Sequence, residues 1–224
     1  MVIQVTGADS GVGEALALYC LEKGHKVGVG LHTFENESKW SNYKDNACVL
    51  KTDVCDEDGL RSAAEELHKK FGAVDVVITM AGLLADGDRK NDIVHTDISE
   101  LRKMFEVNTI GVLTGFRAFY SVMKKGGLYV AITSGGGNFI QEDTLFPAYT
   151  VTKAAANKMT QTIKNTVTDV RICAVHPGRV NTRMGRTTAQ IEVDESISGI
   201  YGIITSEEPL PFWFLNYDGS PLSI

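Results

Sequence analysis

Short apolar runs alternate along the chain with longer segments whose apolar positions recur every three to four residues. The short runs predict strands over residues 2–5, 26–31, 47–51, 74–79, 128–133 and 171–175. The longer segments predict amphipathic helices over residues 13–23, 57–70, 98–125 and 149–168, with another helix beginning near residue 193. This alternation implies right-handed crossovers, and therefore a parallel sheet flanked by helices on both faces.

The predicted strands VDVVIT and LYVAIT have few alternating polar positions, which is typical of strands that are buried on both sides. The 224 residues contain no linker rich in Pro, Gly or Ser and no internal repeat. We therefore expect residues 1–224 to form a single domain of the α/β class, a doubly wound sheet of the Rossmann type. Ligands of such sheets bind beyond the carboxyl ends of the strands, so the residues that follow each strand are the functional candidates.

Composition and charge narrow the possible partners. The net charge is −6 and no basic run occurs, which argues against nucleic acid or an anionic membrane as the main partner. The four cysteines, Cys20, Cys48, Cys55 and Cys173, are scattered without a CxxC pair, as expected of buried thiols in a reducing compartment. No apolar run reaches the roughly 18 residues of a membrane span, and no signal peptide is visible, so we expect a cytoplasmic protein. The histidines form no metal-binding pair, and we expect no metal site.

A glycine-rich turn follows the first predicted strand and leads directly into a helix. It reads TGADSGVG and contains Gly7, Asp9, Ser10, Gly11, Val12 and Gly13. Glycines allow positive φ angles and a close approach of the backbone, and the helix N-terminus attracts negative charge. The turn therefore predicts a site for the pyrophosphate of a dinucleotide.

The end of the second strand bears on which dinucleotide is bound. An acidic residue there would bind the ribose hydroxyls of NAD, and a basic one would accommodate the 2′-phosphate of NADP. Leu31 stands where Asp would be expected, and His32 could meet the phosphate. These residues favour NADP, although Asp9 in the glycine turn would repel a phosphate and leaves NAD possible.

The next two strand ends supply further candidates. Asp53 follows the third strand, where it would lie near the adenine amino group or would instead begin the next helix. Ala81 and Gly82 follow the fourth strand and are small enough to let the backbone approach the cofactor.

Tyr149 and Lys153 stand one helical turn apart at the start of the helix that follows the fifth strand. A neighbouring ammonium favours phenolate, so we expect Lys153 to lower the pKa of Tyr149 and make it a usable acid and base. Ser134 ends the fifth strand, and Ser134 and Tyr149 can therefore converge on one substrate oxygen.

Two other tyrosines, Tyr19 and Tyr120, also stand four residues before a lysine. Both lie near the far ends of their predicted helices, away from the carboxyl ends of the strands. Position therefore favours Tyr149 as the catalytic tyrosine.

Taken together, the motifs resemble the short-chain dehydrogenase/reductase family over essentially the whole chain. They occur in the family's order as TGADSGVG, the pair Asp53 and Val54, MAG at 80–82, VNTIG with Asn108, Ser134, YTVTK at 149–153 and HPGRVNT at 176–182. The later segments further resemble the branch that contains the developmental C-factor and the carbonyl-reductase-like sniffer proteins.

The resemblance implies an NAD(P)-dependent oxidoreductase, with NADPH-dependent reduction of a carbonyl compound, or the reverse, as its reaction. It implies a catalytic tetrad of Asn108, Ser134, Tyr149 and Lys153. Tyr149 would exchange a proton with the substrate oxygen that Ser134 holds, Lys153 would bind the nicotinamide ribose, and Asn108 would anchor a relay water. The residues around the nicotinamide carboxamide would be Pro177, Gly178, Val180 and Thr182.

The chain departs from the family pattern in two places. Thr79 and Met80 replace the usual pair of asparagines, and the interval from Ser134 to Tyr149 is slightly wide. We therefore expect GGGNFIQEDTLFPA to form an enlarged loop beside the substrate, with Thr133 as a weaker substitute for Ser134. Candidate walls of an open substrate pocket are Leu83, Leu84, Phe139, Phe146, His176 and Met184.

Two further expectations concern assembly and a rival function. The predicted helices 98–125 and 149–168 carry apolar residues over more than one face, more than contact with one sheet needs. On the first of these helices the residues are Met104, Phe105, Val112, Leu113, Phe116 and Phe119. Members of the resembled family commonly pair through these helices, which implies a homodimer or homotetramer. The rival to an enzyme is a cofactor-binding signalling or regulatory protein on the same fold, in which turnover is incidental.

Overall fold

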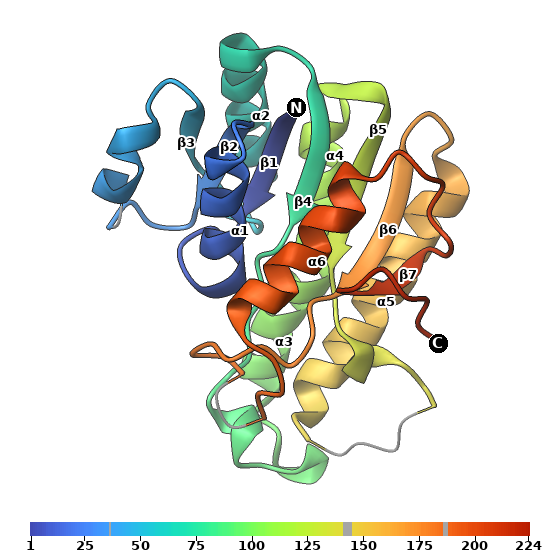
Figure 1. Cartoon of the computed structure of the whole chain (residues 1–224). Helices are drawn as coiled ribbons and strands as arrows, with labels where there is room; N and C mark the ends of the chain where they lie inside the picture. Colours follow the sequence, from blue (N-terminus) through green and yellow to red (C-terminus); the bar gives the residue numbers. More distant parts are fainter. Residues whose placement is uncertain (36, 141–144, 186–187) are drawn as a thin grey trace.

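The parallel sheet predicted from the sequence is present in the computed structural model, which describes residues 1–35, 37–140, 145–185 and 188–224 (Figure 1). Within these residues seven parallel strands lie in the order β3-β2-β1-β4-β5-β6-β7. They are β1 (Val2–Thr6), β2 (Lys26–Leu31), β3 (Ala47–Lys51), β4 (Val74–Thr79), β5 (Met123–Ile132), β6 (Arg171–His176) and β7 (Phe214–Asn216). The chain runs outward from β1 to β3 and then returns to β4, so the winding direction changes between β1 and β4, where such folds bind ligands.

Helices cover both faces of the sheet, as predicted for a doubly wound domain. One face packs against α1 (Gly11–Glu22) and α6 (Val193–Thr205). The opposite face packs against α2 (Glu57–Phe71), α4 (Gly111–Tyr120) and α5 (Pro147–Thr166). The strand interiors are almost wholly buried, which explains their continuous apolar runs. The α/β fold class is therefore confirmed.

The long helix predicted over residues 98–125 is wrong. The chain instead forms α3 (Ile98–Phe105), a π-helical turn (Glu106–Ile110) and α4, and β5 already begins at Met123. The π turn carries Asn108 inward, where its side chain bonds to the main chain that follows β4. The other predicted elements agree with the observed bounds within two residues, except that β5 begins five residues before the predicted residue 128. The three-residue strand β7 was not predicted.

The burial of the cysteines agrees with the sequence prediction for three of the four. Cys20, Cys48 and Cys173 are buried free thiols as expected, but Cys55 is exposed because it lies in the loop after β3.

No helix in the described residues is long and apolar enough to span a membrane.

The reasoning behind the predicted dimer is weakened by burial inside the single chain. Four of the six apolar residues that suggested it pack in this chain's own core, namely Met104, Val112, Phe116 and Phe119.

Candidate active site

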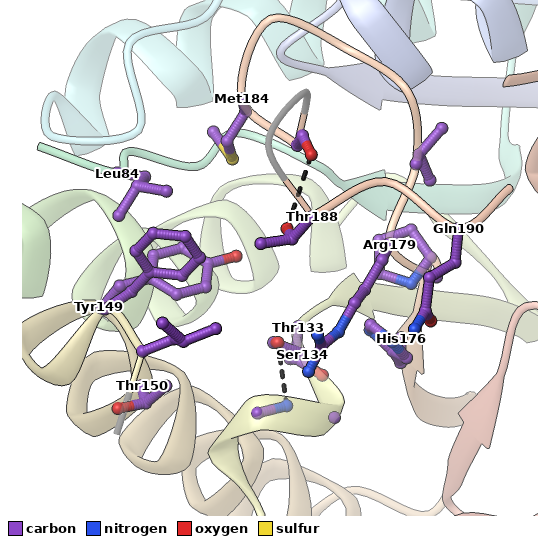
Figure 2. A pocket seen from close by; sticks show the side chains of 18 of the residues that line it. Leu84, Thr133, Ser134, Tyr149, Thr150, His176, Arg179, Met184, Thr188 and Gln190 are labelled. Atoms are coloured by element: carbon purple, nitrogen blue, oxygen red, sulfur yellow. Dashed lines mark hydrogen bonds between the residues drawn. The ribbon is translucent and has the colours of Figure 1, made fainter. Parts of the chain in front are cut away.

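A cavity of about 460 Å³ opens at the carboxyl ends of β5 and β6 (Figure 2). Residues that follow β5, the start of α5 and the segment after β6 form its walls. Seven predicted site residues line it, namely Val12, Ser134, Tyr149, Pro177, Gly178, Val180 and Thr182. Its volume is within the range usual for small-molecule sites.

The predicted pocket walls are right in four cases and wrong in two. Leu84, Phe146, His176 and Met184 line the cavity. Leu83 and Phe139 do not: Phe139 is 82% exposed, and the main chain of Leu83 is bonded to Asn108. The predicted enlarged loop falls partly on residues 141–144, which lie outside the described residues.

Ser134 and Tyr149 come together across the cavity. Ser134 Oγ accepts a hydrogen bond from the Gly136 main-chain N–H at 3.1 Å, which fixes the serine at the start of a 3₁₀ turn. Ser134 and Tyr149 both line the cavity, and the Ser134 side chain is close enough to the phenol to act on its acidity. The neighbouring Thr133 hydroxyl is buried and has no hydrogen-bond partner among the described residues.

Lys153 lies directly behind Tyr149 on α5. Its side chain is buried, its Nζ donates to the carbonyl of Ile132 at 3.2 Å, and Nζ lies 5.6 Å from the centre of the Tyr149 ring. Burial lowers the pKa of Lys153 to about 8, because a buried ammonium loses its hydration.

Burial dominates the acidity of Tyr149. It raises the pKa of the phenol to about 12, and the nearby Ser134 side chain only partly opposes this increase. The expected lowering by Lys153 is therefore wrong in its net direction. At neutral pH Tyr149 is a protonated phenol, which is the form that can donate a proton to a carbonyl oxygen.

Asn108 connects the loop after β4 to α5. Its Oδ1 accepts from the Leu83 N–H at 2.7 Å, and its Nδ2 donates to the Leu83 carbonyl at 2.8 Å and to Thr152 Oγ1 at 2.9 Å. Since the amide has only two donor hydrogens, both of its donors are used in positioning protein groups, while Oδ1 keeps a second lone pair. A relay water could therefore bind the main chain of Asn108 or donate to the free lone pair of its Oδ1.

Asp88 was missed from the sequence and holds the start of the catalytic helix. This buried carboxylate, in the loop after β4, accepts from the N–H of Ala148 at 2.9 Å and from the N–H of Tyr149 at 2.8 Å. It thereby satisfies two of the free N–H groups that begin α5. No local pattern could reveal this contact, because Asp88 lies about 60 positions before its partners.

Arg89 contacts two residues that line the cavity. Its Nη2 donates to the Met184 carbonyl at 2.6 Å, and its guanidinium lies 5.5 Å from the centre of the Phe146 ring. Phe146 has φ of 55°, the one non-glycine residue with positive φ among the described residues, and it directly precedes Pro147 at the start of α5.

The glycine turn fits the pyrophosphate of a dinucleotide. Gly7 and Gly11 have φ of 69° and 62°, and a Cβ added to Gly7 would lie 2.8 Å from the Ala81 nitrogen. A Cβ added to Gly13 would lie 2.2 Å from the Gly7 carbonyl oxygen. Ser10 begins α1 without a side-chain cap, so the first N–H groups of this helix remain available to an anion.

The loop after β2 is held by the carboxylate of Asp9. Its oxygens accept from the His32 N–H at 2.9 Å and from the Thr33 N–H at 3.1 Å. Leu31, predicted to occupy the ribose-binding position, is buried in the core instead. His32, which follows Leu31, is exposed at this edge.

Asp53 lies beside His32 at the same edge. The distance from Asp53 Oδ2 to His32 Nδ1 is 3.9 Å. The alternative that Asp53 begins the next helix is wrong, because Asp56 caps α2. Val54 is buried beside Gly111 of α4, so only its main chain could contact a nucleotide.

Gly82 lies between two members of the predicted tetrad. A Cβ added to it would lie 3.7 Å from both Asn108 Oδ1 and Lys153 Nζ.

In the part of the chain that the structure describes, no group of three His, Cys, Asp or Glu residues could hold a metal ion.

Comparison with known proteins identifies the class. Residues 1–192 match the short chain dehydrogenase family. The chain belongs to this family and is an oxidoreductase.

Two curated relatives are similar over most of the chain. A 2-(R)-hydroxypropyl-CoM dehydrogenase of Xanthobacter autotrophicus is 30% identical over 193 residues, which span 80% of this chain and 74% of that protein. A farnesol dehydrogenase of Aedes aegypti is 28% identical over 220 residues, 92% of this chain and 85% of the relative.

Solved structures share the fold. The carbonyl reductase Sniffer of D. melanogaster superposes with a TM-score of 0.90 at 21% identity, covering 100% of this chain and 99% of that one. An NADPH-bound carbonyl reductase from chicken fatty liver gives a TM-score of 0.83 at 22% identity, with coverage of 100% and 94%. The resemblance to the sniffer-containing family seen in the sequence is thus confirmed at the level of the family and the fold.

Proposed function

We propose that the protein reduces a carbonyl compound to an alcohol with NADPH, or runs the reverse reaction, with Tyr149 as the acid and base. The observation that carries this proposal is the convergence of Ser134 and Tyr149 on one cavity, with Lys153 behind Tyr149, beside a glycine turn that fits a pyrophosphate. The free cysteine thiols favour a reducing, cytoplasmic setting.

The cofactor would lie along the carboxyl edge of the sheet. Its pyrophosphate would meet the N–H groups at the start of α1, its adenosine would lie at His32 and Asp53, and its nicotinamide carboxamide would contact the segment 177–182. When bound, it supplies a hydride to the carbonyl carbon and leaves oxidised, while the oxygen takes up a proton.

The protein's residues handle that proton. Ser134 holds the carbonyl oxygen and polarises it, and Tyr149 donates the proton to the same oxygen. As Tyr149 becomes phenolate, the Lys153 ammonium stabilises the new negative charge. Asp88 holds the main chain of Tyr149 so that its phenol stays aimed into the cavity.

NADPH is the favoured nucleotide over NADH. His32 is exposed at the ribose edge, and the charge of Asp9 is partly satisfied by two main-chain N–H groups. In support, NADP is bound in a similar short-chain dehydrogenase/reductase structure from Burkholderia multivorans, with a TM-score of 0.85 at 21% identity.

The test is oxidation of NADPH that depends on an added carbonyl compound, measured with a panel of aldehydes and ketones and repeated with NADH. Tyr149→Phe should lose most turnover, on the order of 10²-fold or more, while its cofactor affinity and melting temperature stay near those of the unmodified protein. Tyr120→Phe is the matched control, because Tyr120 Oη donates to Asp169 on the surface, away from the cavity.

The rival signalling role makes the opposite prediction. A protein that only binds the cofactor would show NADPH binding in calorimetry but no carbonyl-dependent oxidation, and Tyr149→Phe would change nothing.

A further inference from the structure

The side chain of Arg89 joins two walls of the cavity that come from different parts of the chain. Its Nη2 donates to the Met184 carbonyl at 2.6 Å, and its Cζ lies 5.5 Å from the centre of the Phe146 ring. Phe146 directly precedes α5 and Met184 follows β6, and both line the cavity. Arg89 itself is not among the described residues of the lining, so any effect that it has on a substrate passes through these two walls.

The main chain at Arg89 is attached to the helix that carries Tyr149. Arg89 ends a 3₁₀ turn (Gly87–Arg89) in the loop after β4. The residue before it, Asp88, is buried and accepts from the N–H groups of Ala148 and Tyr149 at the start of α5. The Arg89 side chain therefore begins at a point that is fixed relative to the reacting phenol.

Stability gives little reason for an arginine at position 89. The side chain is only 17% exposed, and its ion pair is a long one, 4.0 Å from Nε to the carboxylate of Asp86, which is 91% exposed. Its Nη1 is buried and has no hydrogen-bond partner among the described residues. Burying a charged group with an unused donor costs free energy, and apolar replacement of such a group is often neutral or stabilising. A role in the site explains the arginine better than a contribution to folding.

The two walls that Arg89 contacts are apolar and lie near the phenol. Figure 2 shows Leu84 and Met184 at the same end of the cavity as Tyr149. Phe146 has φ of 55°, a conformation that persists in a bulky residue only where its surroundings hold it. The contact with Arg89 is one such support. The position of both walls therefore depends on the same guanidinium.

We propose that Arg89 is a positioning residue that fixes the gap between Phe146 and Met184, and that this gap selects carbonyl compounds with a bulky apolar substituent. This rests on the proposed function. The hydrogen bond holds the main chain at Met184, and the cation–π contact holds the Phe146 ring. Replacing Arg89 releases both walls, so a substrate loses the contacts made in the gap and keeps those made at Ser134 and Tyr149.

The experiment compares benzaldehyde with 4-tert-butylbenzaldehyde, which has the same reacting group and a larger apolar substituent. In the unmodified protein the larger aldehyde should have the higher kcat/KM, chiefly through a lower KM. Arg89→Met should reduce the ratio of the two kcat/KM values by about tenfold and leave kcat for benzaldehyde within about threefold, because even one methylene in a fitted pocket is worth about 10- to 200-fold.

Stability and a control variant separate this role from a structural one. The melting temperature of Arg89→Met should be unchanged or raised, because a poorly satisfied buried charge is removed. Arg117→Met is the matched control, because Arg117 is an exposed α4 residue paired with Glu57, outside the cavity. It should leave the ratio of the two aldehydes unchanged.

Two further variants test the route through the walls. Arg89→Lys has one ammonium in place of a planar fork, so it should keep at most one of the two contacts and give an intermediate ratio. If Arg89→Met does not fold, Arg89→Lys decides, and a ratio equal to that of the unmodified protein would contradict the inference. Met184→Ala removes one wall, so adding Arg89→Met to it should change the ratio much less than in the unmodified protein.

Three results would overturn the inference and leave carbonyl reduction standing. They are equal kcat/KM for the two aldehydes in the unmodified protein, an equal loss of both in Arg89→Met, and an undiminished effect of Arg89→Met in the Met184→Ala background.

If neither aldehyde is turned over, the proposed function fails and calorimetry decides the inference separately. With NADPH present, 4-tert-butylbenzyl alcohol should bind at least about tenfold more tightly than benzyl alcohol, and Arg89→Met should remove most of this difference. Equal binding of the two alcohols by the unmodified protein, or a difference that Arg89→Met leaves intact, would overturn the assignment of Arg89.

Discussion

Ser134 and Thr133 are adjacent hydroxyl residues with different surroundings. Ser134 Oγ accepts a hydrogen bond from the Gly136 N–H and lines the cavity together with Tyr149, whereas the Thr133 hydroxyl has no partner among the described residues. We predict that Ser134→Ala lowers kcat by at least about tenfold, with 10²-fold or more expected for a lost oxyanion donor, and hardly changes cofactor affinity.

Thr133→Val is the matched control, because it removes a buried hydroxyl at nearly constant volume. It should keep kcat and leave the melting temperature unchanged or raised. A large kinetic loss in Thr133→Val, with Ser134→Ala near normal, would show that Thr133 and not Ser134 binds the reacting oxygen.

The acidity of Tyr149 gives the two reaction directions different pH profiles. Carbonyl reduction needs the protonated phenol, whose pKa is raised to about 12, and the charged Lys153, whose pKa is about 8. Its kcat/KM should therefore be flat below about pH 8 and fall above it. Alcohol oxidation needs phenolate, so its kcat/KM should rise about tenfold per pH unit below that pKa.

The loss of charge on Lys153 should flatten the rise of kcat/KM with pH in alcohol oxidation. With a pKa of about 8 it loses its charge as the pH rises, and the phenolate then loses a stabilising neighbour. The rise should therefore flatten above about pH 8. Rates measured in both directions over this range check the prediction, and an oxidation rate independent of pH would contradict it.

At the residue scale, the sequence and the family resemblance together located Ser134, Tyr149 and Lys153, which the structure brings together. They could be found because each follows a strand end or lies one helical turn from such a residue. The direction of the Tyr149 pKa shift could not be found, because it depends on burial by segments distant in sequence. Leu31 was misassigned because β2 continues through it into the core.

At the scale of elements, the start of α5 depends on a carboxylate from another loop. Asp88→Ala would remove two hydrogen bonds from buried N–H groups and should cost about 2 kcal/mol or more of stability, since each bond involves a charged acceptor. It should also lower kcat by roughly tenfold, because the main chain of Tyr149 would lose its anchor.

Asp56→Ala provides the comparison, because Asp56 caps α2 through the Gly59 N–H, away from the cavity. It should cost about 1 kcal/mol of stability and leave kcat unchanged. Asp88→Asn should recover part of both losses. Melting curves and kcat for the three variants check the prediction, and a purely structural role for Asp88 would leave kcat intact.

Element types were predicted well, and errors occurred where tertiary contacts override local pattern. The segment 98–125 has helical periodicity throughout, but the bonds from Asn108 to Leu83 favour a π turn within it. Its last part enters β5, where pairing with β4 outweighs helix propensity. The three residues of β7 are too few to show a period.

At the scale of the whole molecule, we predict a homodimer formed through α4 and α5. Ile110 and Val151 remain exposed on neighbouring elements, next to the hydrogen bond that joins Thr109 to Thr152. Sedimentation should give twice the mass of the single chain at micromolar concentration. Val151→Asp should produce a monomer, whereas Val94→Asp, at an exposed site in the loop after β4, should not.

At position 146 the left-handed backbone favours glycine, whereas the contacts of the side chain favour phenylalanine. A bulky residue with positive φ costs about 1–3 kcal/mol, and glycine would remove most of that cost. The Phe146 ring, however, lines the cavity and lies against Arg89. Selection for heat resistance alone should therefore drive position 146 toward glycine. Selection for turnover should instead retain the aromatic ring. The residue found at this position in hot-adapted and cold-adapted descendants would then show which of the two selected properties mattered more in each lineage.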